Sequence, residues 1–95
     1  MNRLLILPVL LLTLLVGTPA FSADFQKGLN AARSGDYATA LREWTPFAKQ
    51  GHVDAQFAIG FFYANGLGVP KNKETAVMWF GLAAEQGHAD AQYHL

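Results

Sequence analysis

The sequence GHVDAQ at residues 51–56 returns 36 residues later as GHADAQ at residues 87–92, with one change. The match continues outward at the same offset, pairing Ala40 with Ala76, Trp44 with Phe80, Phe47 with Ala83, Ala48 with Ala84, Phe57 with Tyr93 and Ile59 with Leu95. Similarity at one fixed offset over about 20 positions indicates a stack of copies of one structural unit.

Each copy carries the pattern of a helix followed by a second helix. Within 72–86, apolar residues recur at helical spacing, at Ala76, Trp79, Phe80, Ala83 and Ala84. Asn72 is placed to cap this helix, and Gly87 suits the left-handed residue that follows its last turn. The segment 53–64 has a similar apolar face, with Asp54 or His52 near its cap. NGLGVP at 65–70 predicts the loop between the two helices.

The preceding residues repeat this order more loosely. Segments 25–35 and 36–51 each predict a helix, the second capped by Asp36. Pro46 lies about ten residues into that second helix and predicts a kink there, or a helix that ends early and restarts. With a fifth helix starting near Ala89, we expect an all-α fold, a short α-solenoid of helix-turn-helix repeats. GHxDAQ is then the joint between repeats: a Gly ends one helix, an Asp caps the next and an Ala opens it.

The first 22 residues have the pattern of a secretory signal peptide. Arg3 precedes the apolar run 4–16, and the small-residue stretch 17–23 follows. The run is too short for a bilayer core, which needs about 20 residues. We therefore expect cleavage after Ser22, export to the periplasm or the outside of the cell, and no stable membrane anchor after cleavage.

Composition excludes several classes of function. The remaining 73 residues carry six basic and seven acidic side chains, so their net charge is −1 and no basic patch predicts nucleic-acid binding. The chain has no cysteine, which excludes disulfides, thiolate zinc sites and thiol nucleophiles.

Residues 55–87 resemble the Sel-one-like repeat (SLR), a branch of the tetratricopeptide superfamily. The resemblance lies in one series of residues: Ala55, Ile59, Gly60, Tyr63, Gly66, Gly68, Val69, Ala76, Trp79, Phe80, Ala83, Ala84 and Gly87. Asn72 stands where the family favours Asp, and Phe80 where Tyr is common. The resemblance implies an α-solenoid that acts as a protein-interaction scaffold, with exported bacterial members in envelope processes and host interaction. A cysteine-rich subgroup is associated with β-lactam binding or hydrolysis, and this chain lacks its cysteines.

The expected organisation has four parts: a signal peptide at 1–22, a degenerate first helical repeat at 23–51, a complete SLR-type repeat at 52–87 and the truncated start of a further repeat at 88–95. Repeat arrays generally need about three units. Two explanations stay open for the last part: the chain is a truncated form of a longer array, or it completes itself by pairing with another copy.

The histidines are the candidates for metal or acid–base chemistry. His52 and His88 occupy equivalent joints, and stacked repeats separate such positions by about 10 Å or more, too far to share one ion. His94 has no partner at helical spacing. We interpret these residues as solvated, and we expect no catalytic, cofactor-binding or metal-binding residue.

Aromatic residues give the one candidate binding site. Phe57 and Phe61 lie well away from the Ile59–Tyr63 packing face, and Tyr93 is the equivalent of Phe57. These three predict an aromatic patch for a protein or peptide partner. The alternative is that they pack against the next repeat. The expected function is an exported scaffold for protein–protein interaction without catalysis. The alternatives are a cell-envelope enzyme acting on β-lactam or peptidoglycan, and an inactive truncated fragment.

Overall fold

The computed structural model describes residues 24–95, and within them all regular structure is α-helical. A first helix covers 24–33, followed by α2 (Tyr37–Lys49), α3 (Val53–Asn65), α4 (Lys73–Glu85) and α5 (Ala89–His94). The expected all-α repeat fold is confirmed. The predicted signal peptide at 1–22 lies outside the described residues.

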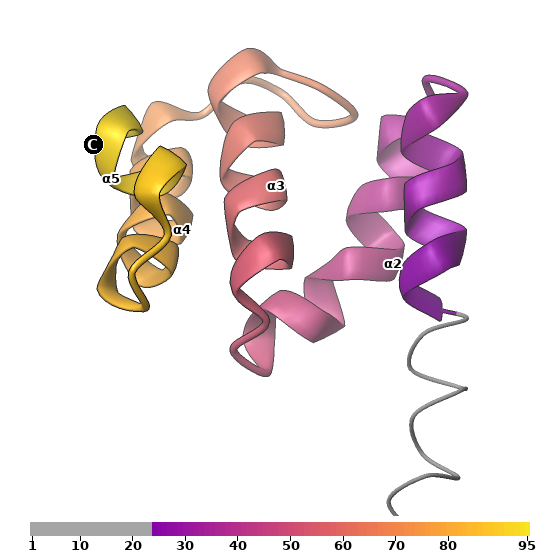
Figure 1. Cartoon of the computed structure of the whole chain (residues 1–95). Helices are drawn as coiled ribbons and strands as arrows, with labels where there is room; N and C mark the ends of the chain where they lie inside the picture. Colours follow the sequence, from indigo (N-terminus) through magenta and orange to yellow (C-terminus); the bar gives the residue numbers. More distant parts are fainter. Residues whose placement is uncertain (1–23) are drawn as a thin grey trace, which may run out of the picture.

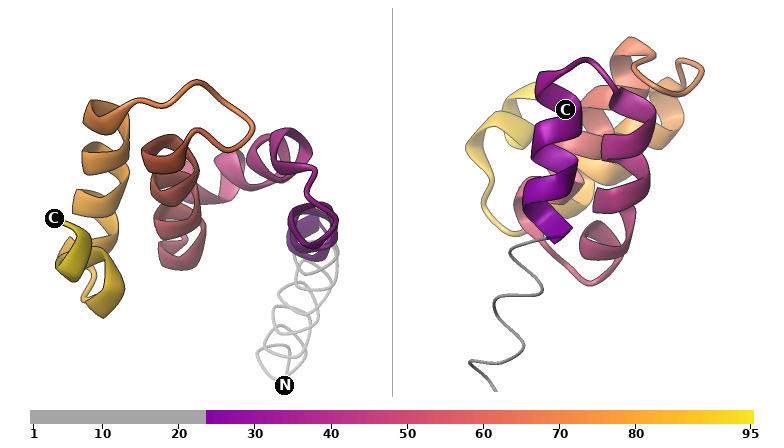
Figure 2. Two further views of the ribbon diagram at one scale, coloured as in Figure 1. Left: turned by 90° about the horizontal axis from the view of Figure 1, so that it is seen from above. Right: turned by 90° about the vertical axis from the view of Figure 1, so that its right-hand side faces the viewer.

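The helices alternate between two layers. The first helix, α3 and α5, here called the A helices, lie toward the viewer in Figure 1, and the B helices α2 and α4 lie behind them. The view from above in Figure 2 shows the helices following one another along one direction. Each A helix is therefore followed along the chain by the B helix behind it, as in a helical-repeat solenoid.

The ends of the helices follow from local chemistry. Asp36 Oδ1 accepts a hydrogen bond from the Thr39 N–H at 3.2 Å, and Asn72 Oδ1 accepts one from the Thr75 N–H at 3.0 Å, which confirms both predicted caps. The hydrogen bond with Thr39 holds the pKa of the Asp36 carboxyl below its usual value of 3.8. Gly87, with φ 89°, takes the left-handed conformation expected after α4.

Pro46 neither ends nor interrupts its helix. It lies inside α2, which continues to Lys49. Figure 1 shows the axis of α2 turning toward α3 along its second half. Of the two expected outcomes, the bend occurs and the early end does not. Pro46 lacks the N–H of one helical hydrogen bond, but it lies so near the end of α2 that only the last turn follows it.

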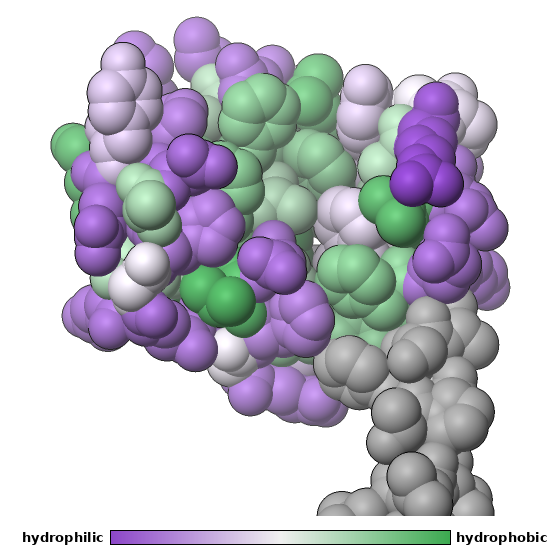
Figure 3. All heavy atoms as spheres, in the orientation of Figure 1, coloured by the Kyte–Doolittle hydropathy of each residue, from purple (hydrophilic) through white to green (hydrophobic). Residues whose placement is uncertain are grey.

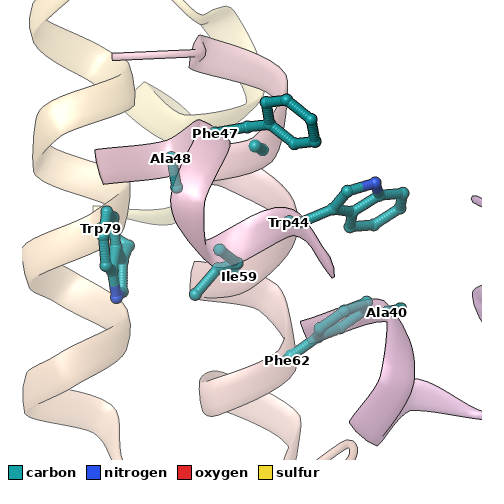
Figure 4. Close-up of a cluster of buried hydrophobic side chains, with 8 residues drawn as sticks. Ala40, Trp44, Phe47, Ala48, Ile59, Phe62 and Trp79 are labelled. Atoms are coloured by element: carbon teal, nitrogen blue, oxygen red, sulfur yellow. The ribbon is translucent and has the colours of Figure 1, made fainter. Parts of the chain in front are cut away.

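The core lies between the layers and joins the two units. Its main cluster consists of Ala40, Trp44, Phe47, Ala48, Ala55, Ile59, Phe62 and Trp79. Trp79 of α4 is 9% exposed and belongs to the same cluster as Ile59 and Phe62 of α3. Figure 4 shows Phe62 directed from α3 toward Ala40, below the ring of Trp44. A second cluster, Ala76, Phe80, Ala83 and Ala91, lies between α4 and α5.

The first helix pair repeats the second, with a shorter connection. A Cβ added to Gly60 would lie 2.7 Å from the Phe80 ring, and one added to Gly28 would lie 2.4 Å from Trp44 Nε1. Each glycine therefore lets an A helix approach the large ring of its own B helix. The rings are 36 residues apart and the glycines 32, because the connection is 34–36 in the first pair and 66–72 in the second. A search at one fixed offset misses this equivalence.

Candidate functional site

The joint between repeats is capped by histidine. His52 Nδ1 accepts a hydrogen bond from the Ala55 N–H, and His88 Nδ1 accepts one from the Ala91 N–H, both at 3.1 Å. Of the two residues expected near the start of α3, His52 is the cap. The interpretation of the aspartate of GHxDAQ as the cap was wrong, because Asp54 lies in the first turn of α3. The imidazole two residues before the aspartate accepts the hydrogen bond from the free N–H, and the aspartate lies in the first turn, where the helix dipole favours an acid.

The same histidines pack against aromatic rings. His52 stacks on Phe25 with ring centroids 4.9 Å apart, and His88 stacks on Phe57 at 4.5 Å. Both histidines are half-buried, so the interpretation of solvated joint residues was wrong. Because Nδ1 accepts from the backbone, the neutral ring carries its proton on Nε2. In His88 this atom lies 3.8 Å from the Asp54 carboxylate of the previous joint.

The glutamine of GHxDAQ ties each A helix to the preceding B helix. Gln56 is buried, and its Nε2 donates to the Ala48 carbonyl at 3.1 Å; Gln92 Nε2 donates to the equivalent Ala84 carbonyl at 3.2 Å. Gln86 Nε2 in turn donates to Gln56 Oε1 at 2.8 Å. Helical periodicity did not predict this role, although the return of glutamine at a fixed offset was a signal for it.

The three predicted partner-binding residues all lie on A helices, with different exposure. Phe61 is 39% exposed and Tyr93 is 87% exposed. Phe57 is half-buried, since His88 covers one face of its ring and the Phe80 ring lies 5.5 Å away. Phe57 and Phe61 adjoin, with centroids 6.5 Å apart. The structure therefore brings Phe57 and Phe61 together and gives Phe57 a packing role as well.

The surface around these rings is apolar with acidic ends. Asp54, Phe57 and Phe61 are spaced at helical-neighbour intervals along α3, and Asp90 and Tyr93 repeat the first two positions on α5. We call this surface the A face. Figure 3, which looks onto the A helices, shows apolar residues gathered over α3 with hydrophilic residues on either side. Asp54 is the only charged residue of α3.

Within 24–95, no three His, Asp or Glu side chains come together in a way that could hold a metal ion. His94 contacts its own helix, with Nδ1 2.7 Å from the Asp90 carbonyl oxygen, and its ring lies 5.5 Å from that of Phe80. No helix within the same residues is both long enough and apolar enough to span a bilayer.

Comparison with known proteins agrees with this geometry. Residues 53–88 match the family model described as the Sel1 repeat. The chain is similar to "Protein sel-1 homolog 2" of Rattus norvegicus, with 38% identity over 77 residues. That alignment covers 80% of this chain and 11% of the rat protein, so the chain spans about a tenth of that relative's length. No solved structure matches the chain. The matched residues run from the start of α3 through the joint at His88.

Proposed function

Since this chain is a Sel1-repeat protein, we propose that it is a scaffold whose A face binds a protein or peptide partner. The observation that carries the proposal is that Phe61 and Tyr93 are exposed on adjacent A helices. Asp54 lies two turns before Phe61, and Asp90 lies one turn before Tyr93. Exposed aromatic rings supply much of the binding energy of protein interfaces. Contiguous apolar patches with polar residues around them mark interaction sites on protein surfaces.

The charges indicate the character of the partner. On α3 and α5 the acids lie at the N-terminal end of the aromatic stripe, and neither helix carries a lysine or an arginine. A partner segment with apolar side chains followed or preceded by a basic residue would match both features. We therefore propose that the ligand of the A face is a peptide segment that combines a basic residue with aromatic or aliphatic side chains.

The test compares two exposed positions on opposite layers. Phe61→Ser removes the ring from the A face, while Met78→Ser changes a residue of α4 that is 52% exposed and lies on a B helix. The parent protein and the two variants are each immobilised and incubated with a cell-envelope extract. We expect a protein that the parent and Met78→Ser retain and that Phe61→Ser loses. Equal retention by all three would contradict the A face as the binding site.

We also propose that the scaffold is exported and has no catalytic activity of its own. The apolar run 4–16 and the small residues behind it support export to the periplasm or outside the cell. The intact mass of the protein from the periplasmic fraction should correspond to a start at Ala23 or Asp24, and a mass that includes Met1 would contradict cleavage. Turnover of a chromogenic β-lactam or of peptidoglycan by the purified protein would contradict the absence of catalysis.

A further inference from the structure

His88 makes three contacts at the edge of the A face. Its Nδ1 accepts the hydrogen bond from the Ala91 N–H that caps α5, and its ring stacks on Phe57 with centroids 4.5 Å apart. Its Nε2 lies 3.8 Å from Asp54 Oδ1. The side chain of Asp54 is 71% exposed and that of His88 is 18% exposed. The acid is therefore open to a partner, while the histidine beside it is largely covered.

One proton changes which of these contacts the imidazole can keep. The neutral ring accepts at Nδ1 and carries its proton on Nε2, so it caps α5 and faces the carboxylate at the same time. The imidazolium carries a proton on both nitrogens and has no acceptor left. Its Nδ1–H would then face the Ala91 N–H, donor against donor. The charged ring therefore loses the cap and keeps the contact with Asp54, where opposite charges attract.

The same proton changes the charge of the A face. Asp54 is the only charged residue of α3, so the sign of the charge at that end of the aromatic surface depends on it. Beside a neutral His88 the pair carries one negative charge, whereas beside the imidazolium the two charges cancel. Glu85, the last residue of α4, and Asp90, in the first turn of α5, are the other acids next to this joint in the sequence. Neither is ion-paired with His88 in this structure.

We propose that His88 makes partner binding at the A face sensitive to pH. When His88 is neutral, the Asp54 carboxylate is available to the basic residue of a partner. As the pH falls through the range of about 8 to 5, in which histidines change charge, His88 pairs with the carboxylate itself and the partner loses that contact. A bound basic partner must oppose protonation of His88 to the same extent. The inference rests on the proposed binding function and names the regulation of that surface.

Nuclear magnetic resonance of the protein alone tests the exchange of contacts without any partner. The Asp54 carboxyl carbon and the Ala91 amide are followed from about pH 8 to about pH 5, the range of histidine protonation. We expect both signals to move with the ring signals of His88, and to move much less in His88→Asn, which keeps a capping oxygen and cannot gain a proton. His52→Asn changes the equivalent histidine of the other joint and should behave as the parent does. His94, which also contacts the Phe57 ring, is present in all three proteins, so the comparison isolates His88. Equal movement of the Asp54 carbon in the parent and in His88→Asn overturns the proposal.

Binding of the A-face partner tests the consequence. The protein that the parent retains from the envelope extract is eluted, and its dissociation constant is measured near the two ends of the histidine range, at about pH 7.5 and about pH 5.5. We expect the parent to bind about two- to fivefold more weakly at the lower pH, the usual effect of one exposed charge pair. His88→Asn should weaken less, and His52→Asn should weaken as the parent does.

Two outcomes of these measurements separate the inference from the scaffold function. Equal weakening of binding in the parent and in His88→Asn would place the pH-sensitive group elsewhere and overturn the inference, while the A face would remain the binding site. If Phe61→Ser retains everything that the parent retains, the scaffold proposal fails. The resonance experiment still decides in that case whether His88 exchanges the Ala91 N–H for Asp54.

Discussion

At the residue scale, glycine sets how closely the two layers approach. Gly60 and Gly81 lie in the middle of helices, where alanine is intrinsically better by about 0.5–1 kcal/mol. The two positions differ in their surroundings, since a Cβ on Gly60 would meet the buried Phe80 ring and one on Gly81 has nothing within 4 Å. For a change to alanine at Gly60, helix propensity favours the alanine and packing opposes it. At Gly81 packing does not oppose the change.

Gly60→Ala should destabilise the protein by about 1–3 kcal/mol, the usual cost of overpacking a core. Gly81→Ala should stabilise it by about 0.5–1 kcal/mol, because only the helix propensity changes. Chemical denaturation of both variants against the parent gives the two differences. If both variants are stabilised, Phe80 can move aside without loss and the close contact is not what fixes the approach of the helices.

Asp36 provides a pH-dependent contribution at the same scale. Because hydrogen bonding lowers its pKa in the folded state, its stabilisation is complete above the usual value of 3.8 and is lost as the pH falls through the lower folded value. Asp36→Asn keeps a capping oxygen but cannot titrate. We expect the two proteins to melt at similar temperatures at about pH 7, and the variant to gain an advantage below about pH 3.8. A constant difference across this range would show that the Asp36 cap does not depend on its charge.

At the scale of the element, the joint shows what sequence patterns predict and what they miss. Apolar spacing located α3 and α4 to within about two residues, because each helix must bury one face. The caps of α3 and α5 were assigned to aspartate because serine, threonine, aspartate and asparagine are the usual capping residues. The histidine that caps α5 also stacks on Phe57, a contact that exists only once successive helices are in place.

Two variants of His88 separate capping from stacking. His88→Asn keeps an acceptor for the Ala91 N–H and loses the ring, whereas His88→Ala loses both. Loss of a cap costs about 0.5–2 kcal/mol, so we expect His88→Ala to be the less stable of the two by roughly that amount. Both variants should increase the exposure of Phe57, measurable by its aromatic proton shifts. Equal stability of the two variants would indicate that the hydrogen bond to Ala91 contributes little.

At the scale of the whole molecule, the two helix pairs are held together by one continuous core. Trp79 comes from α4, yet it belongs to the cluster formed mainly by α2 and α3. Trp79→Ala should cost about 3–5 kcal/mol, as for other large core aromatics, which is a large part of the stability of a small domain. Thermal unfolding followed by circular dichroism measures it. A midpoint within a few degrees of the parent would place Trp79 outside the cooperative core.

The predicted binding surface illustrates the limit of sequence reasoning at this scale. Helical geometry placed Phe57, Phe61 and Tyr93 on one kind of helix, because that depends on the period alone. Whether each ring is exposed depends on its neighbours from other units: His88 covers Phe57, and no described residue covers Tyr93 to the same extent. The hollow lined by Ala64, Lys73, Ala76, Val77, Phe80 and His94 could not be predicted either, since residues of three helices define it.

The repetition of the joint has a consequence for how such a chain can change in length. The joint before α3 and the joint before α5 present the same groups. Each has a left-handed glycine, a histidine that caps the next helix, and a glutamine that donates a hydrogen bond to the preceding B helix. A tandem duplication of 52–87 would therefore join, at its new boundary, surfaces that already fit each other. The chain can then grow or shrink by whole units while the contacts at each joint stay the same. An insertion of any other size inside a unit would have to be accommodated by the connecting loop. The four-residue difference between the two helix pairs is accommodated in this way.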